Sequence, residues 1–176
     1  MKSINQFMKI RIIAFLIVAA LSSCAYTFSG ASIPTEMKTV TVRFFENSAP
    51  LVIPTLSQQF TEAVKSRIRS QTRLSITPAD GDAIFEGRIT GYEIRPVALT
   101  SSSTPTASNN RLTITVAVKY INNIKGHDKE SFEESFTRFY DFPLNGASIQ
   151  SLQPVAIESI NKQLTEDIFN RAFAQW

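Results

Sequence analysis

The chain has 176 residues, with 18 Lys and Arg against 15 Asp and Glu, one His and one Cys. A single Cys excludes an intramolecular disulfide, and with a single His it also excludes zinc clusters and multi-His metal sites. Hydrophobic residues make up 43% and charged residues 19%, a balance typical of a folding chain. The net charge of +3 would suggest nucleic acid as a partner, so the position of the excess charge matters.

A basic start and a short apolar run open the chain. Lys2, Lys9 and Arg11 precede residues 12–21, a run of consecutive apolar or small residues. Because this run has about half the length that a helix needs to cross a bilayer, it predicts a signal-peptide core and not a membrane span. It ends in the sequence LSSC at Cys24, which resembles the lipobox of bacterial lipoproteins.

The lipobox resemblance divides the chain into three parts. Residues 1–23 would be a cleaved signal peptide, residues 24–38 a lipidated lead and residues 39–176 one domain. The resemblance implies a diacylglycerol and a further acyl chain such as palmitate on Cys24, which together anchor a protein stably. This covalent lipid is the only attached group that we expect, with no other cofactor. The alternative is an ordinary secretory signal followed by a free or buried Cys24.

The excess positive charge belongs to the predicted signal. Removing residues 1–23 takes away three basic residues and no acidic one, which leaves 15 of each sign. We therefore expect no nucleic-acid partner. Residues 25–29 contain no acidic side chain, and by resemblance to lipoproteins in general this favours the outer membrane, with the domain facing the periplasm.

In the first half of the domain, the residue pattern predicts a strand, then a helix, then a second strand. Alternation over residues 39–45 predicts a half-buried strand, and residues 46–54 read as a loop. Thr55 can cap a helix whose apolar residues recur every four positions. A strand follows at 83–97, with a bulge expected at Gly91 because the apolar set shifts by one residue there.

The second half predicts two more strands and a helix. Residues 100–110 form an uncharged loop, and the strict alternation over 111–121 is the clearest strand in the chain. The segment 131–142 has Phe residues spaced as on a helix face, yet its Phe, Thr and Tyr content favours a strand. The final helix is expected from Pro154 to about residue 174.

These elements predict an α+β sandwich, with two helices packed on one face of a small, mostly antiparallel sheet of four to five strands. The other face would be polar. Its expected residues are Thr41, Arg43, Glu86, Arg88, Thr90, Thr113, Thr115 and Lys119.

Catalytic chemistry is not indicated. His127 lies in the expected hairpin loop at 122–128, where a solvated surface residue is the usual reading. Glu133 and Glu134 are neighbours on a predicted strand, so their side chains point to opposite faces and cannot act as a pair. No nucleophile elbow, P-loop or dinucleotide-binding pattern occurs. A basic cluster at residues 65–73 could meet phosphates or an acidic partner, but a solvated helix end that complements the helix dipole is the favoured interpretation.

Four segments together resemble the LptE family of outer-membrane lipoproteins that assemble lipopolysaccharide. They are CAYTFSGASIP at 24–34, KTVTVRFFEN at 38–47, PTLSQQFTEAV at 54–64 and AIFEGRITGYEI at 83–94. The resemblance extends into the C-terminal helix and is greatest to the branch found in Bacteroidetes-type bacteria.

The resemblance implies a non-enzymatic protein that plugs the lumen of the lipopolysaccharide translocon, the LptD-type β-barrel. It would stabilise this barrel and assist lipopolysaccharide transport while its lipid sits in the inner leaflet of the outer membrane. Arg95, Arg111, Lys119 and Lys125 are the candidate lipopolysaccharide contacts, since they flank or follow the uncharged loop. The alternative is a periplasm-facing scaffold or binding lipoprotein that acts on cell-wall enzymes.

Overall fold

A computed structural model describes residues 33–51, 53–97, 109–144 and 146–174. The predicted signal peptide, Cys24 and most of the loop at 99–110 lie outside the described residues. The elements are β1 (Thr39–Val42), β2 (Glu46–Asn47), α2 (Leu56–Gln71), β3 (Ser75–Ile76), β4 (Ala83–Val97), β5 (Asn109–Asn122), the 3-10 helix η1 (Asp128–Glu130), β6 (Phe132–Pro143) and α3 (Ile149–Phe173). Over the described part of the chain, neither helix combines the length and apolar character of a membrane span.

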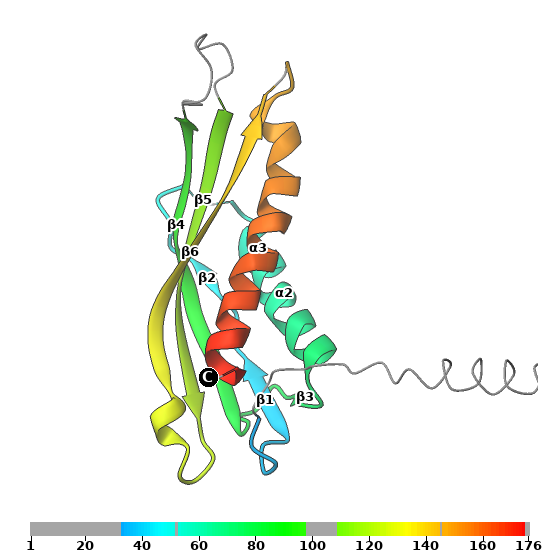
Figure 1. The fold of residues 1–176 in the computed structure, drawn as a ribbon, viewed down its shortest axis with the longest axis vertical. Coiled ribbons are helices and arrows are strands. Elements are labelled where there is room, and N and C mark those ends of the chain that lie inside the picture. Colours follow the sequence, from blue (N-terminus) through cyan, green and yellow to red (C-terminus); the bar gives the residue numbers. More distant parts are fainter. Residues whose placement is uncertain (1–32, 52, 98–108, 145, 175–176) are drawn as a thin grey trace, which may run out of the picture.

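The predicted α+β class is confirmed, with α2 and α3 side by side on one face of a single sheet (Figure 1). The sheet is mixed, however, and has six strands in the order β3-β1-β4-β5-β6, with β2 also paired to β4. The expectation of a mostly antiparallel sheet holds only for β4, β5 and β6. Strand β1 runs parallel to both β3 and β4, because α2 carries the chain back before the next strand begins.

The long strands match their predicted positions. β4 spans the predicted 83–97, and its pairing with β5 shifts register between Ile89 and Gly91, which confirms the bulge. The ambiguous segment at 131–142 is a strand, β6, paired with β5 along its length. The reading of 46–54 as loop alone was wrong for Glu46–Asn47, which pairs with β4.

The first strand is shorter than predicted. β1 ends at Val42, and the chain then turns so that Phe45 becomes fully buried, with its backbone N–H donated to the Thr61 hydroxyl of α2. The ring of Phe45 meets that of Phe60 edge to face at 5.1 Å. Burial of this ring explains why the alternating pattern did not continue as one strand.

The start of α2 lies where it was predicted, whereas that of α3 does not. Thr55 occupies the N-cap position of α2 but makes no side-chain cap hydrogen bond. α3 begins five residues before Pro154, at Ile149, where the side chain of Ser148 accepts a hydrogen bond from the Ser151 backbone N–H. Pro154 therefore lies inside the helix, in its second turn, where it removes one intrahelical hydrogen bond.

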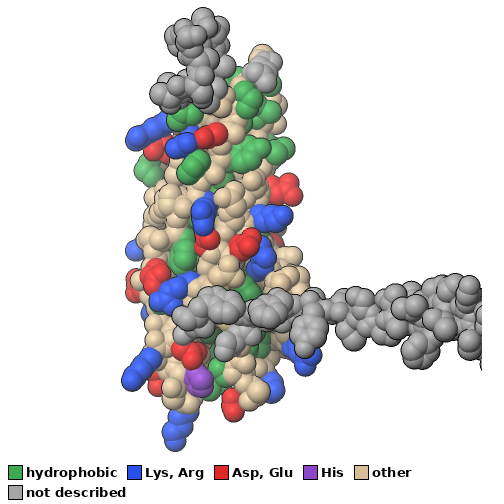
Figure 2. Space-filling view, in the orientation of Figure 1, with side chains coloured by type: hydrophobic (Ala, Val, Ile, Leu, Met, Phe, Trp, Pro, Cys, Tyr) green, Lys and Arg blue, Asp and Glu red, His purple; other side chains and the backbone are tan. Residues whose placement is uncertain are grey.

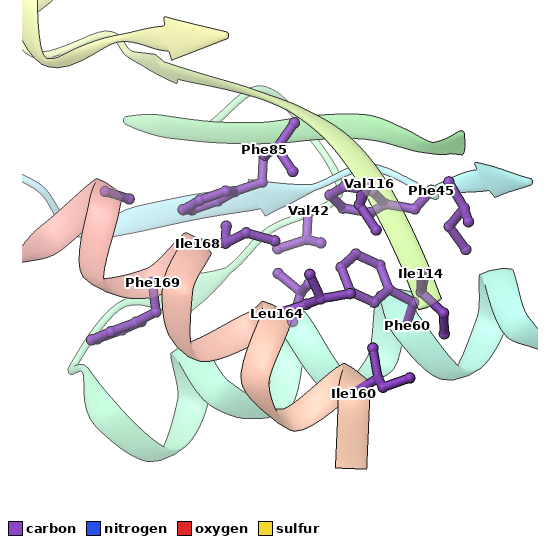
Figure 3. Close-up of a cluster of buried hydrophobic side chains, with 14 of the residues drawn as sticks. Val42, Phe45, Phe60, Phe85, Ile114, Val116, Ile160, Leu164, Ile168 and Phe169 are labelled. Carbon is purple, nitrogen blue, oxygen red and sulfur yellow. The ribbon is translucent and has the colours of Figure 1, made fainter. Parts of the chain in front are cut away.

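The core lies between the sheet and the two helices (Figure 3). Phe85 of β4 lies 4.8 Å from Tyr120 and 5.8 Å from Phe173 of α3, measured between ring centroids. On the helix side, Leu164 and Ile160 are completely buried. The apolar side chains thus gather on the face of the sheet that the helices cover, which we call the covered face. The opposite face carries no helix.

Candidate functional site

The face of β4, β5 and β6 that points away from the helices is a mainly polar surface defined by the strand register. We call it the open face. Strand pairing arranges its residues in rows of three, with one residue each from β4, β5 and β6. In order along the strands, the rows are Glu86–Lys119–Glu133, Arg88–Ala117–Ser135, Gly91–Thr115–Thr137, Glu93–Thr113–Phe139 and Arg95–Arg111–Asp141. Apart from Gly91, Ala117 and Phe139, these residues are polar, and both signs of charge occur among them.

Opposite charges are paired along the open face. The Glu86 carboxylate lies 3.1 Å from the Lys119 ammonium and 3.4 Å from the Arg43 guanidinium. At the other end of the face, Arg111 donates two hydrogen bonds of 2.7 Å to the Asp141 carboxylate. In the space-filling view, basic and acidic side chains are likewise interspersed and do not form one patch of a single sign (Figure 2).

Hydroxyl groups occupy the middle of the open face. Thr115 and Thr137 face each other across β5 and β6, with their hydroxyl oxygens 2.9 Å apart. Thr41, which was predicted to share the polar face, is instead only 5% exposed. Its hydroxyl donates to the Ala79 carbonyl, because the turn before β4 covers that corner of the sheet.

The four candidate lipopolysaccharide contacts do not form one site. Arg95 and Arg111 are register partners on adjacent strands, next to the end where β4 stops. Lys119 lies eight residues further along β5, roughly 27 Å away at the usual rise of a strand. Lys125 follows β5, in the connection to η1 at the far end of the sheet.

Three of these four basic residues form ion pairs with carboxylates of the same domain. The Arg95 guanidinium lies 2.6 Å from Glu93, while Arg111 and Lys119 have the partners described above. The charge-assisted hydrogen bonds between Arg111 and Asp141 raise the pKa of the guanidinium and lower that of the carboxyl. Both groups therefore remain charged near neutral pH, and the pair presents little net charge to a ligand.

Sequence reasoning did not single out Phe139. Its ring is 49% exposed on the open face, and the Arg111 guanidinium carbon lies 3.8 Å from the ring centroid. The alternation within β6 could have indicated this, since Phe139 has the parity of Glu133 and Thr137, on the face away from the helices. It is the aromatic contact that this end of the open face offers.

The basic cluster at residues 65–73 of α2 and the turn after it is partly neutralised by nearby carboxylates. The Lys65 ammonium lies 2.7 Å from Glu62, and the Arg67 guanidinium lies 3.4 Å from Glu166 of α3. These contacts favour the solvated, charge-compensated helix end over a phosphate site.

The single histidine of the sequence, His127, lies in the turn before β6. The Nδ1 atom of His127 lies 2.6 Å from Glu130, whose other oxygen accepts a hydrogen bond from the Asn122 side chain. The two glutamates of β6 do separate, since Glu133 lies on the open face and Glu134 bonds Arg171 of α3. Within the described residues, no cluster of three or more His, Cys, Asp or Glu side chains could hold a metal ion.

The domain is an α+β sandwich, with two helices on one face of a mixed sheet and a charge-compensated polar surface on the other. A family comparison identifies the family to which it belongs. Residues 37–172 match the family model described as "LptE: Lipopolysaccharide-assembly", so the chain belongs to the LptE family. It is thus a member of a non-enzymatic lipoprotein family of the outer membrane, associated with the lipopolysaccharide transport machinery. No curated protein matches the chain.

Solved structures resemble this chain at low sequence identity. A putative neuraminyllactose-binding hemagglutinin homolog from Helicobacter pylori aligns with a TM-score of 0.52 and 10% identity, over 82% of this chain and 88% of that one. The rare lipoprotein B from Shewanella oneidensis aligns with a TM-score of 0.48 and 13% identity, over 76% and 92% of the two chains. The Helicobacter structure supports the fold alone.

Proposed function

We propose that this chain plugs the lumen of an LptD-type outer-membrane β-barrel, stabilises that barrel and assists the passage of lipopolysaccharide to the outer leaflet. Acyl chains on Cys24 hold it in the inner leaflet, and the domain enters the barrel from the periplasm. The single observation that carries the proposal, beyond family membership, is the open face.

The open face suits the interior of a barrel. Barrel lumens are polar, whereas the lipid-facing side is apolar, so a plug needs a surface whose polar groups tolerate both water and polar walls. Pairs such as Arg111 with Asp141 and Lys119 with Glu86 supply charges without a net field. A binding surface of one sign would instead select an oppositely charged ligand.

Co-purification tests the plug. A tagged chain solubilised from outer membranes is expected to bring down one large β-barrel protein in stoichiometric amount. Thr115→Trp places a bulky ring in the middle of the open face and should reduce the recovered barrel severalfold. The matched control is Lys129→Trp in η1, which follows β5 and lies outside the rows of paired residues, and it should leave recovery unchanged. Recovery of cell-wall synthases in place of a barrel would overturn the proposal.

The anchor has its own test. Cys24→Ala is expected to remove the acyl mass seen by mass spectrometry of the intact protein, and to move the chain from the membrane to the soluble periplasmic fraction. An acylated Cys24→Ala protein would place the lipid on another residue.

For lipopolysaccharide, we propose the adjacent Arg95 and Arg111 as the contact among the four candidates. What supports them is that they are register partners on neighbouring strands, which places two guanidinium groups side by side, and that Arg111 also lies over the exposed ring of Phe139. The double variant Arg95→Ala/Arg111→Ala should weaken capture of purified lipopolysaccharide severalfold, whereas Lys119→Ala and Lys125→Ala should have smaller effects. Equal effects of all four substitutions would contradict a localised contact.

A further inference from the structure

Strand β6 forms one edge of the sheet and is by far the longer of the two edge strands. The opposite edge is β3, which has 2 residues, whereas β6 has 12 and runs along the length of the sheet (Figure 1). It pairs with β5 from Phe132 to Pro143 without a register shift. On its outer side, the N–H and C=O groups of β6 have no strand partner in the described part of the chain.

The β6 edge has few of the features that usually protect an edge strand. Edge strands are commonly kept from pairing with other chains by shortness, prolines, bulges or lysines. β6 is long, its proline comes only at the last position, and it contains no lysine. It is also rich in Phe, Tyr and Thr, which favour strands. This edge is therefore suited to pair with a further strand of matching sequence.

The sequence of β6 matches itself when two copies run antiparallel. If the pair is centred on Phe136, Glu134 of one copy lies opposite Arg138 of the other, and the same pair recurs beyond the centre. In the same register the two Phe136 rings meet, and Phe132 lies opposite Tyr140 on both sides. Opposite charges and aromatic pairs directly across two strands stabilise a sheet. A two-fold interface requires this kind of self-complementary surface.

Neighbouring registers lose the match. Centred on Ser135, the pair places Glu134 opposite a phenylalanine. Centred on Thr137, it places Glu133 opposite Asp141, and like charges directly across two strands are destabilising. A two-fold axis keeps each side chain on its own face of the sheet, so the centre must lie on a residue. Among these three registers, the charges therefore favour the one centred on Phe136.

The charged side chains of this register are exposed and are held in place by α3. Arg171 donates two hydrogen bonds to Oε1 of Glu134, and Arg138 donates two to the Asp167 carboxylate. The Glu134 side chain is nevertheless 43% exposed and that of Arg138 47%. Both bonds from Arg171 reach the same oxygen, so Oε2 of Glu134 can accept a hydrogen bond from Arg138 of a second copy. The two ion pairs would then join into one row of alternating charges across the interface.

We infer that two copies of this chain pair through their β6 edges, antiparallel and centred on Phe136. The two sheets join into one, with the helices of both copies on the same side because the two-fold axis is perpendicular to the sheet. The aromatic pairs continue the core across the interface, since Phe132, Phe136 and Tyr140 already pack against it. This inference goes beyond the proposed plug function and does not rest on it, because it describes the chain outside a barrel.

Charge reversal tests the pairing. Sedimentation equilibrium of the purified Cys24→Ala chain is expected to show a monomer–dimer equilibrium. Arg138→Glu places two carboxylates opposite each other and Glu134→Arg two guanidinium groups, each twice, so either variant should raise the dissociation constant about tenfold. An equimolar mixture of the two variants restores both opposite-charge pairs and should recover the dimer as a heterodimer. The matched control is Glu158→Arg, which lies in the groove between α3 and α2 and should leave the dimer unchanged.

The mixture also distinguishes a lost contact from a lost fold. Each variant carries the same changes within its own chain whether it is alone or mixed, so only a contact between copies can recover the dimer. A Cys24→Ala chain that stays monomeric at every concentration would overturn the inference. A mixture that is no more dimeric than its two components would overturn it as well.

Introduced cysteines test the register. The Cys24→Ala chain has no other cysteine. In the inferred register, Ser135 lies opposite Thr137 of the second copy at a Cα distance of about 5 Å, which a disulfide can span. The two copies of Ser135 are roughly 8 Å apart, which is too far. Mixed and oxidised Ser135→Cys and Thr137→Cys chains should therefore form linked heterodimers, and each variant alone should stay largely unlinked. Equally efficient linking of either variant with itself would overturn the register.

The two proposals fail separately. A chain that dimerises through β6 but recovers no barrel from the outer membrane overturns the plug function alone. A chain that recovers the barrel but stays monomeric when purified overturns the β6 pairing alone.

Discussion

The two faces of the sheet use the same strands for opposite purposes. On the covered face, Leu112, Ile114 and Val116 of β5 are fully buried under the helices. On the open face, Thr113 and Thr115 alternate with them and remain partly exposed. Along β5, side chains that stabilise the core alternate with side chains that a partner can reach. A substitution at one set should therefore leave the other set in place. The following substitutions test that separation, from the largest expected effect on stability to the smallest.

Removal of one aromatic ring from each face should give the largest contrast. Phe85→Ala deletes a ring that is 1% exposed and should lower the free energy of unfolding by about 3–5 kcal/mol. Phe139→Ala removes a half-exposed ring and should cost less than about 1 kcal/mol. Urea denaturation measures both values. Similar losses for the two variants would show that the open face also contributes to the core.

A methyl group at Gly87 should be almost as damaging. A Cβ atom there would lie 2.2 Å from the Ala117 carbonyl oxygen and 2.8 Å from the Phe45 ring, so the backbone of β4 must move. Gly87→Ala should destabilise the domain by about 2–3 kcal/mol. Gly91→Ala is the control, since its closest contact would be 3.1 Å, to Thr115. Thermal unfolding should rank Gly87→Ala clearly below Gly91→Ala, and the reverse order would contradict the packing described here.

The corner where β1 begins depends on a carboxylate. The Asp82 side chain accepts hydrogen bonds of 2.8 Å from the backbone N–H groups of Lys38 and Thr39 and from the Thr39 hydroxyl. Asp82→Asn weakens these charge-assisted bonds and should cost about 1–2 kcal/mol at neutral pH. Asp80→Asn, at an exposed position two residues away, should cost much less.

This corner should also respond to pH. The hydrogen bonds from Lys38 and Thr39 lower the pKa of Asp82 below its usual value of 3.8. The folded state therefore favours the ionised carboxyl, and the resulting stability is present above pH 4 and lost as the pH falls through the lowered pKa. In urea titrations, the difference between native and Asp82→Asn proteins should persist to pH 4 and shrink only in stronger acid. A difference that vanished by pH 5 would contradict this assignment.

The smallest effect is expected in the middle of the open face. Thr115→Val removes the hydrogen bond to Thr137 but keeps a β-branched side chain on a strand. The free energy of unfolding should change by less than about 0.5 kcal/mol. Calorimetry on the purified domain checks this, and a loss above 1 kcal/mol would mean that the hydroxyl pair is a structural element.

Periodicity predicted the elements better than it predicted their pairing. The alternation over β4 and β5 gave nearly the observed bounds because one face of each strand is buried. The parallel pairing of β1 with β4 was missed, although strand, helix and strand in chain order is the pattern that produces it. Pro154 was assigned to the first turn of α3, since the capping residue Ser148 gives a weaker signal in sequence than proline does.

The candidate site was less accessible to sequence reasoning. That Arg95 and Arg111 lie side by side follows from antiparallel pairing across the uncharged loop. The carboxylate partner of Arg111 comes from β6, and its register depends on the length of the turn between β5 and β6.

The start of the sheet and the arginine pair lie at opposite ends of β4. The described chain reaches the sheet at Thr39, beside the beginning of β4, whereas Arg95 lies near the end of β4. Fifteen strand residues span roughly 45 Å, which exceeds the roughly 30 Å hydrocarbon core of a bilayer. We propose that, when the domain stands upright with Thr39 at the level of the inner leaflet, β4 is long enough to carry the arginine pair to the level of the outer leaflet.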